Sequence, residues 1–169
     1  GEAVDKITTV KPQIVFYGGG IEAAAAFAVL SAMQEAGFEF CDSEETADLV
    51  IYNTCAVREN AEARVFGNLG ALKALKAKKP ELVIGVCGCM AQQTKVSDRI
   101  RKSYPYVDIL FGTQVRHKFP EFVYRKLTQG KRVFENPADD SGIFEGIPVH
   151  RDGTFKAWLP IMQGCNNFC

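Results

Sequence analysis

Nearly continuous apolar runs alternate with helix-length segments along the first 130 residues of the chain. Runs of this kind, rich in Val, Ile, Leu, Phe and Tyr, are typical of strands that are buried on both faces. They predict strands at Gln13–Tyr17, Leu49–Thr54, Leu82–Val86 and Asp108–Phe111, with a short edge strand within Gly37–Phe40.

Helices are predicted between these strands. After the second long run, apolar residues recur at spacings of three and four, which is the pattern of a helix that packs one face on a sheet. The residues of this stripe are Val57, Ala61, Val65, Leu69 and Leu72. Two further helices are predicted, one over about Ile21–Ala36 and one over Lys118–Leu127.

This alternation predicts an α/β fold, a doubly wound, flavodoxin-like parallel sheet that helices cover on both faces. The repeat of roughly 30 to 35 residues fits right-handed βαβ units. The strand order expected for such a sheet is 2-1-3-4-5.

The pattern of the sheet ends near Gly130, so the flavodoxin-like domain is predicted to cover residues 11–130. Residues 131–155 are predicted to be a linker, because Asn136–Gly146 is rich in Pro, Gly, Asp and Ser. The apolar run Lys156–Gln163 then resembles the first strand of a different domain, so residues 156–169 are interpreted as its beginning.

Composition narrows the class of protein. Of the 169 residues 47% are hydrophobic and 24% charged, which fits a globular domain and excludes a disordered tail or a small disulfide scaffold. Lys plus Arg equal Asp plus Glu at 20 each, so no net charge draws the chain towards nucleic acid. If the protein acts on RNA, this segment is not expected to be its main RNA-binding surface. No apolar run is long enough for a bilayer and Gly1–Val10 lacks a signal-peptide core, so we expect a cytoplasmic protein without a membrane partner. We also expect this protein to be a monomer.

Two of the six cysteines follow neighbouring strands of the predicted sheet. Cys55 comes directly after one apolar run and Cys89 lies 34 residues later, beyond the next run, so both return to the same sheet edge. Neighbouring strands lie about 4.8 Å apart, a spacing that suits thiolates around an iron–sulfur cluster. The geometry alone leaves ligation and packing open for these two residues. For Cys41 and Cys87 it favours core filling.

A second candidate site is Gly164–Cys169, where Cys165 and Cys169 form a C-x3-C pair in a Gly/Asn loop after an apolar run. Such a loop is poorly suited to core packing, and it is too short to indicate a zinc finger. A natural domain rarely ends on a reactive thiol straight after a new strand. We therefore expect the chain to belong to a longer protein.

Four segments, taken together and in this order, resemble the radical S-adenosylmethionine methylthiotransferases. They are Asn53–Glu62 (NTCAVRENAE), Gly85–Gln92 (GVCGCMAQ), Phe111–Thr113 (FGT) and Gly164–Cys169 (GCNNFC). The resemblance runs from about Gln13 to the end of the chain. The amino-acid sequence of the first segment is most similar to that of the MiaB-type branch, which modifies tRNA rather than a ribosomal protein.

The resemblance implies two [4Fe-4S] clusters in the longer protein. One, on three cysteines of the N-terminal domain, supplies or holds the sulfur to be inserted, and Cys55 and Cys89 would be two of its metal ligands. The other lies on a C-x3-C-x2-C loop of a central barrel, and Cys165 and Cys169 would be its first two ligands.

The resemblance also implies the reaction. The open iron of the second cluster binds S-adenosyl-L-methionine, and electron transfer yields a 5′-deoxyadenosyl radical that removes hydrogen from an adenine C–H. Sulfur and a methyl group would then be installed at C2 of an N6-modified adenosine next to the anticodon. The implied partners are S-adenosylmethionine and the tRNA anticodon stem-loop, bound by the longer protein with help from a C-terminal domain. Residues 1–169 alone are expected to be inactive.

The sequence departs from the family after its first strand. Where the family has its first cluster cysteine this chain has Gly19, within a stretch of three glycines and four alanines in ten residues. Glycine cannot ligate iron, so the N-terminal cluster is expected to be weak or absent unless Cys41 or Cys87 substitutes. Cys87 could do so only if its loop departs from strand geometry.

The same glycines allow an alternative function. Gly18–Gly20, continuing to Ala23, fits G-x-G-x-x-A between a strand and a helix, and Asp42 lies about twenty residues farther on. This is the outline of a Rossmann-like dinucleotide-binding domain that uses Gly18–Gly20 as its phosphate loop. The four family-like segments weigh against it.

Overall fold

The structure, a computed structural model, describes residues 11–17, 33–54 and 61–136. These residues form one sheet in which all paired strands are parallel, in the order β2-β1-β3-β4-β5-β6. The strands are β1 (Gln13–Tyr17), β2 (Glu39–Phe40), β3 (Leu49–Asn53), β4 (Val83–Cys87), β5 (Ile109–Phe111) and β6 (Val133–Glu135). The predicted flavodoxin-like α/β fold is confirmed, including the order of its first five strands.

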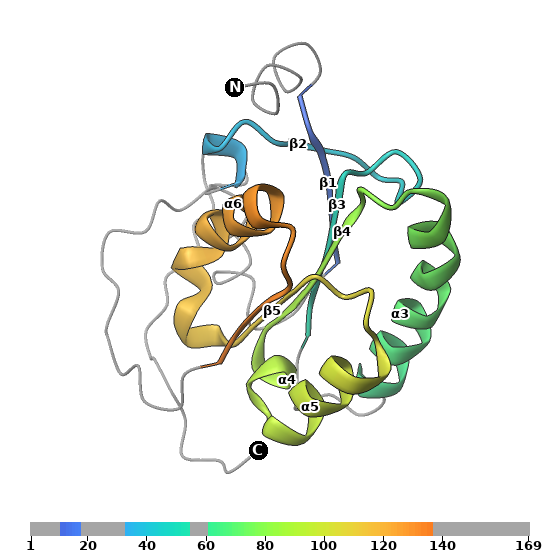
Figure 1. The fold of residues 1–169 in the computed structure, drawn as a ribbon, viewed down its shortest axis with the longest axis vertical. Coiled ribbons are helices and arrows are strands. Elements are labelled where there is room, and N and C mark those ends of the chain that lie inside the picture. The colour runs from blue at the N-terminus through green and yellow to red at the C-terminus, as the bar shows by residue number, and fades with distance from the viewer. Residues whose placement is uncertain (1–10, 18–32, 55–60, 137–169) are drawn as a thin grey trace, which may run out of the picture.

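Helices cover the two faces of the sheet (Figure 1). On one side lie α3 (Ala61–Lys78), α4 (Cys89–Gln92) and α5 (Thr94–Ser103), and on the other lies α6 (Phe119–Gln129), which follows the 3-10 helix η1 (Thr113–Lys118). The predicted stripe is confirmed as the buried face of α3 at Val65, Leu69 and Leu72. Val57 lies outside the described residues, as does most of the predicted helix Ile21–Ala36, of which 33–35 are helical.

Each face of the sheet has its own hydrophobic core because successive strand residues point to opposite sides. Val50, Tyr52 and their neighbours pack beneath α3, α4 and α5. Leu49, Ile51 and Phe111 pack against Phe119 and other residues of α6.

The sheet continues beyond the boundary expected from sequence. Gly130, in the left-handed conformation at φ 67°, ends α6, and the chain then enters β6 beside β5. Residues 133–135 were expected to belong to the linker 131–155 but complete the edge of the sheet. With only three residues, β6 carries too little hydrophobic pattern to be recognised.

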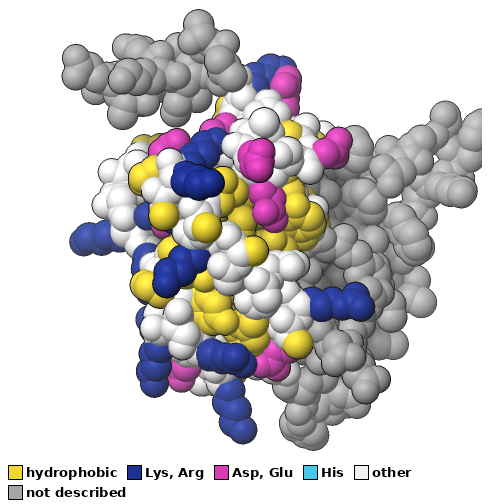
Figure 2. All heavy atoms as spheres, turned by 90° about the vertical axis from the view of Figure 1, so that its right-hand side faces the viewer, with side chains coloured by type: hydrophobic (Ala, Val, Ile, Leu, Met, Phe, Trp, Pro, Cys, Tyr) yellow, Lys and Arg dark blue, Asp and Glu magenta, His cyan; other side chains and the backbone are white. Residues whose placement is uncertain are grey.

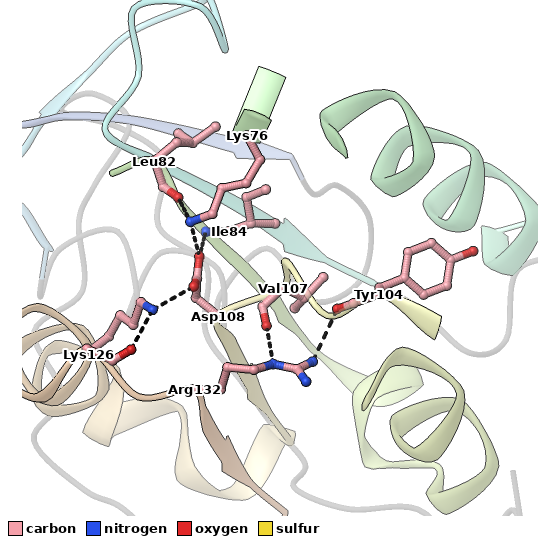
Figure 3. A network of polar contacts seen from close by, with 9 residues as sticks. Lys76, Leu82, Ile84, Tyr104, Val107, Asp108, Lys126 and Arg132 are labelled. Atoms are coloured by element: carbon pink, nitrogen blue, oxygen red, sulfur yellow. Dashed lines mark hydrogen bonds and ion pairs between the residues drawn. The ribbon is translucent and has the colours of Figure 1, made fainter. Parts of the chain in front are cut away.

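A buried carboxylate holds the amino edge of the sheet together. Asp108, which directly precedes β5, is 4% exposed and lies between the ammonium groups of Lys76 and Lys126 at 2.9 and 2.8 Å (Figure 3). It also accepts the N–H of Ile84 in β4 at 3.0 Å, and Lys76 in turn donates to the carbonyl oxygen of Leu82. One side chain therefore joins β4, β5, α3 and α6.

Asp48 has a similar role at the start of β3. It directly precedes that strand, accepts the N–H of Gln13 in β1 at 2.8 Å, and pairs with Lys79 at 3.2 Å. Its side chain is 46% exposed, so water screens this pair much more than the Asp108 network.

We predict that Asp108→Ala lowers the free energy of unfolding by about 3–5 kcal/mol, because two lysines and a strand N–H lose their shared partner in a buried place. Asp48→Ala is the matched control, with an expected loss of about 1–2 kcal/mol. Urea denaturation of both variants measures the difference. Equal losses would contradict the role assigned to Asp108.

Candidate functional site at the carboxyl edge of the sheet

The ends of β3 and β4 are joined by hydrogen bonds at the carboxyl edge of the sheet. Asn53 and Cys87 are register partners in the two strands. Beyond them Thr54, which is 3% exposed, donates both its N–H and its hydroxyl to the carbonyl oxygen of Cys87, each at 2.9 Å. Its own carbonyl oxygen accepts the N–H of Met90 at 3.3 Å. Thr54, the residue before Cys55, is thus hydrogen-bonded to Met90, the residue after Cys89.

Gly88 allows this close approach. Its φ of 97° lies in the left-handed region, and a Cβ there would lie 2.5 Å from both Asn53 Oδ1 and the carbonyl oxygen of Thr54. Any side chain would therefore push the turn after β4 away from the end of β3.

Cys89 is the first residue of α4 and is partly exposed, whereas the next two residues, Met90 and Ala91, are buried. The helix therefore packs against the protein while its first side chain stays at the surface. The structure places Cys89 at the edge where its chemistry was expected.

The other predicted site residues lie outside the described residues of the chain. They are Cys55, Cys165, Cys169, Gly19 and the remainder of Gly18–Gly20. Among residues 11–17, 33–54 and 61–136, no group of three or more His, Cys, Asp or Glu side chains could hold a metal ion.

Neither Cys87 nor Cys41 is placed to replace a missing ligand. Cys87 is 3% exposed and packs in the core on the α6 side of the sheet, as the core-filling interpretation predicted. Cys41 directly follows Phe40, which is level with Ile14 of β1. Thr54 lies about 13 Å farther along the strands, so Cys41 is too far from the carboxyl edge to share a ligand set with Cys89.

The donor set near Cys89 therefore fits an iron–sulfur cluster incompletely. The hydrogen bond between Thr54 and Met90 brings the residue that precedes Cys55 next to the residue that follows Cys89. Gly19 has no donor atom for a third ligand, and the described cysteines do not supply one.

Two tyrosines lie side by side near the carboxyl ends of β1 and β3, where Tyr17 and Tyr52 are register partners. The rings of Tyr17 and Tyr52 stack with centroids 4.9 Å apart, and the Tyr52 hydroxyl donates to Glu44 at 2.8 Å. Burial, with the nearby carboxylate of Glu44, raises the pKa of both phenols above the ordinary tyrosine value. Both side chains are therefore neutral hydrogen-bonding groups near pH 7 and do not act as bases.

A group of amides near Cys89 was missed by sequence reasoning. Asn136, just beyond β6, donates its Nδ2 to the carbonyl oxygens of Ala91 and Gln92 at 3.2 and 3.0 Å. Gly112 of the FGT segment lies directly against the side chains of Asn136 and Gln92. The resemblance pointed to Gly112, but no local signal distinguishes Asn136 from other residues of the expected linker.

The surface of the described residues carries mixed charge. On the α3 side, Lys and Arg side chains are distributed among hydrophobic and acidic ones rather than gathered in one stripe (Figure 2). Within the described ranges of the chain, no helix is both long and apolar enough to span a bilayer.

The fold and this edge define a class of protein, a doubly wound α/β domain with a cysteine at the carboxyl end of a central strand. Residues 11–112 match the model of Uncharacterized protein family UPF0004, and the chain belongs to this family.

Several similar proteins share one name. The chain is 52% identical over 137 residues to a protein of Clostridium perfringens (strain 13 / Type A) named tRNA-2-methylthio-N(6)-dimethylallyladenosine synthase, a match covering 81% of this chain and 31% of that protein. Proteins of the same name from Clostridium tetani and Caldicellulosiruptor saccharolyticus are 50% identical over 137 residues and 46% over 156, covering 81% and 92% of this chain and 30% and 33% of those proteins. The chain spans about a third of these relatives. The resemblance to methylthiotransferases is confirmed, and the dinucleotide-binding alternative is not favoured.

We predict that Gly88→Ala lowers the free energy of unfolding by about 2 kcal/mol or more, because the new methyl group overlaps Thr54 and the φ angle is strained. Gly70→Ala is the control: this α3 glycine has open space around its Cβ position, and alanine there stabilises the helix by about 0.5–1 kcal/mol. Thermal and urea denaturation test the opposite signs. A stable Gly88→Ala variant would remove the steric argument for the edge.

Proposed function

We propose that the chain is the N-terminal domain of a tRNA methylthiotransferase. The complete protein would insert sulfur and a methyl group at C2 of an N6-modified adenosine next to the anticodon. The observation that carries the proposal is the 52% identity over 137 residues to relatives named for that modification. Cys89 is partly exposed and the next residue is hydrogen-bonded to the residue that precedes Cys55, which gives the match a chemical site.

Two sets of cysteines carry the proposed chemistry. Cys55 and Cys89 are thiolate ligands of the N-terminal iron–sulfur site. Cys165 and Cys169 are the first two ligands of the radical cluster, which when bound supplies the electron for cleavage of S-adenosylmethionine. The contribution of the described residues is to hold the backbone of Cys89 next to that of Thr54.

Gly19 makes the N-terminal site incomplete in this chain. Three thiolates are expected and two are supplied, while Cys87 is enclosed by the core and Cys41 is remote from the edge. We therefore expect this chain to hold iron at its N-terminal site weakly or not at all.

The proposed partners are S-adenosylmethionine and the anticodon stem-loop of tRNA, bound by a monomeric protein of the cytoplasm. Because the α3 side carries mixed charge rather than a basic surface, we assign most of the RNA binding to the rest of the longer protein.

Iron binding tests the ligand assignment. In a Cys165→Ala/Cys169→Ala background, which leaves only the N-terminal site, we expect anaerobic reconstitution with iron and sulfide to give well under one cluster per chain. Gly19→Cys is expected to raise the content to about four iron atoms per chain, with absorbance near 400 nm, because it adds the third thiolate.

Cys89→Ala in the Gly19→Cys chain should abolish this gain, while Cys41→Ala should leave it unchanged. A full cluster in the unmodified Gly19 chain would show that another residue supplies the third ligand.

The reaction is tested in a chimera. Residues 11–136 replace the matching segment of the Caldicellulosiruptor saccharolyticus relative, and 2-methylthio nucleosides are measured by mass spectrometry after incubation with tRNA carrying N6-dimethylallyladenosine. We expect product from the Gly19→Cys chimera, little from the Gly19 chimera and none from residues 1–169 alone. A Gly19→Cys chimera that holds iron in both sites but yields no product would refute the proposed function.

A further inference from the structure

The helix that carries Cys89 is held in place by residues outside it. With four residues, α4 forms a single turn, and so short a helix has little stability of its own. This turn is held by burial of Met90 and Ala91 and by the hydrogen bond from Met90 to Thr54. At its carbonyl end, the N–H of Gln93 donates to the carbonyl oxygen of Met90 at 3.2 Å, and another group bonds the carbonyl oxygens of Ala91 and Gln92.

That other group is the side chain of Asn136, 44 residues beyond Gln92. Carbonyl groups in the last turn of a helix have no partner within it. The amide nitrogen of Asn136 has two protons, and it donates to the carbonyl oxygens of Ala91 at 3.2 Å and Gln92 at 3.0 Å. One side chain thus caps the end of α4.

The end of β6 brings Asn136 to this position. Glu135 accepts the N–H of Gly112 at 3.2 Å through its carbonyl oxygen, and its carboxylate pairs with Arg125 of α6 at 2.8 Å. A Cβ on Gly112 would overlap the side-chain oxygen of Gln92 and lie 2.7 Å from Asn136 Oδ1. The missing side chain at position 112 therefore lets the two amides lie over the end of β5.

We propose that Asn136 is a positioning residue for the thiol of Cys89. Cys89 and Gln92 are the two ends of one helical turn, about 5 Å apart along its axis, so a group that fixes one end also restricts the other. The ligand role of Cys89 rests on the proposed function, whereas its placement by Asn136 does not. Because Asn136 follows β6, the position of the Cys89 side chain then depends on the outermost strand of the sheet, next to β5.

Site-resolved alkylation of the reduced chain tests this placement without iron, S-adenosylmethionine or RNA. Each cysteine is labelled with iodoacetamide under native conditions and its rate is read by peptide mass spectrometry. In Asn136→Ala we expect Cys89 to react about five times faster, because loss of the cap raises the population of opened α4. Cys41, at the far edge of the sheet, and the buried Cys87 should keep their rates.

Two variants separate the hydrogen bonds from simple loss of volume. Asn136→Asp keeps the shape but replaces the donor nitrogen by an acceptor, so it should accelerate Cys89 at least as much as alanine does. Asn68→Ala removes an exposed asparagine from α3 and should change none of the rates.

An unchanged Cys89 rate in Asn136→Ala would overturn the proposal. So would equal acceleration of Cys41, Cys87 and Cys89, which reports general loss of stability. If alanine prevents folding, Asn136→Ser, which retains one donor, replaces it and must still accelerate Cys89 selectively. Because the assay involves no methylthio transfer, its failure leaves the proposed function standing, and inactivity of the chimera leaves this placement standing.

Discussion

The close approach of Gly88 to the end of β3 is the constraint on which the site depends. In a parallel sheet all strands finish at one edge, but that alone leaves the loops free to diverge. Here the turn after β4 lacks a side chain at the one position where a Cβ would strike Asn53 and Thr54. The main chain of Thr54 can therefore bond both Cys87 and Met90. Two segments of the sequence more than thirty residues apart are joined by peptide groups, which keep their geometry whatever their side chains do.

Different kinds of contact hold the amino and carboxyl edges of the sheet. At the amino edge, Asp108 and the lysines around it connect strands to helices through charge, in a place largely shielded from water. At the carboxyl edge, main-chain groups and the amide of Asn136 hold the turn that carries Cys89, and the Glu135–Arg125 ion pair lies beside Asn136 at the end of β6.

The sequence allowed the long elements to be predicted, and the reason is their pattern. Gln13–Tyr17 and Leu49–Asn53 are apolar runs of full strand length, and the stripe through Val65 and Leu72 has helical spacing over several turns. Short elements such as α4 and β6 hold three or four residues each, too few for a period to be measured. The candidate site shares this limit: the sequence favoured core filling for Cys87, as its burial confirms, but nothing in the sequence distinguished Asn136 from its neighbours.

The contacts described above for α4 come from apolar burial, main-chain groups and an amide, and this bears on the unusual residue at position 19. In proteins whose folding is coupled to metal binding, loss of a ligand loosens the surrounding chain. Here Met90 and Ala91 are buried, Thr54 accepts a main-chain hydrogen bond from Met90, and Asn136 donates to the carbonyl oxygens of Ala91 and Gln92. The scaffold around Cys89 is thus specified by packing and amide groups. Under the proposed function, a change in the number of cysteines is therefore expected to alter what this edge binds and to leave the described scaffold around Cys89 in place.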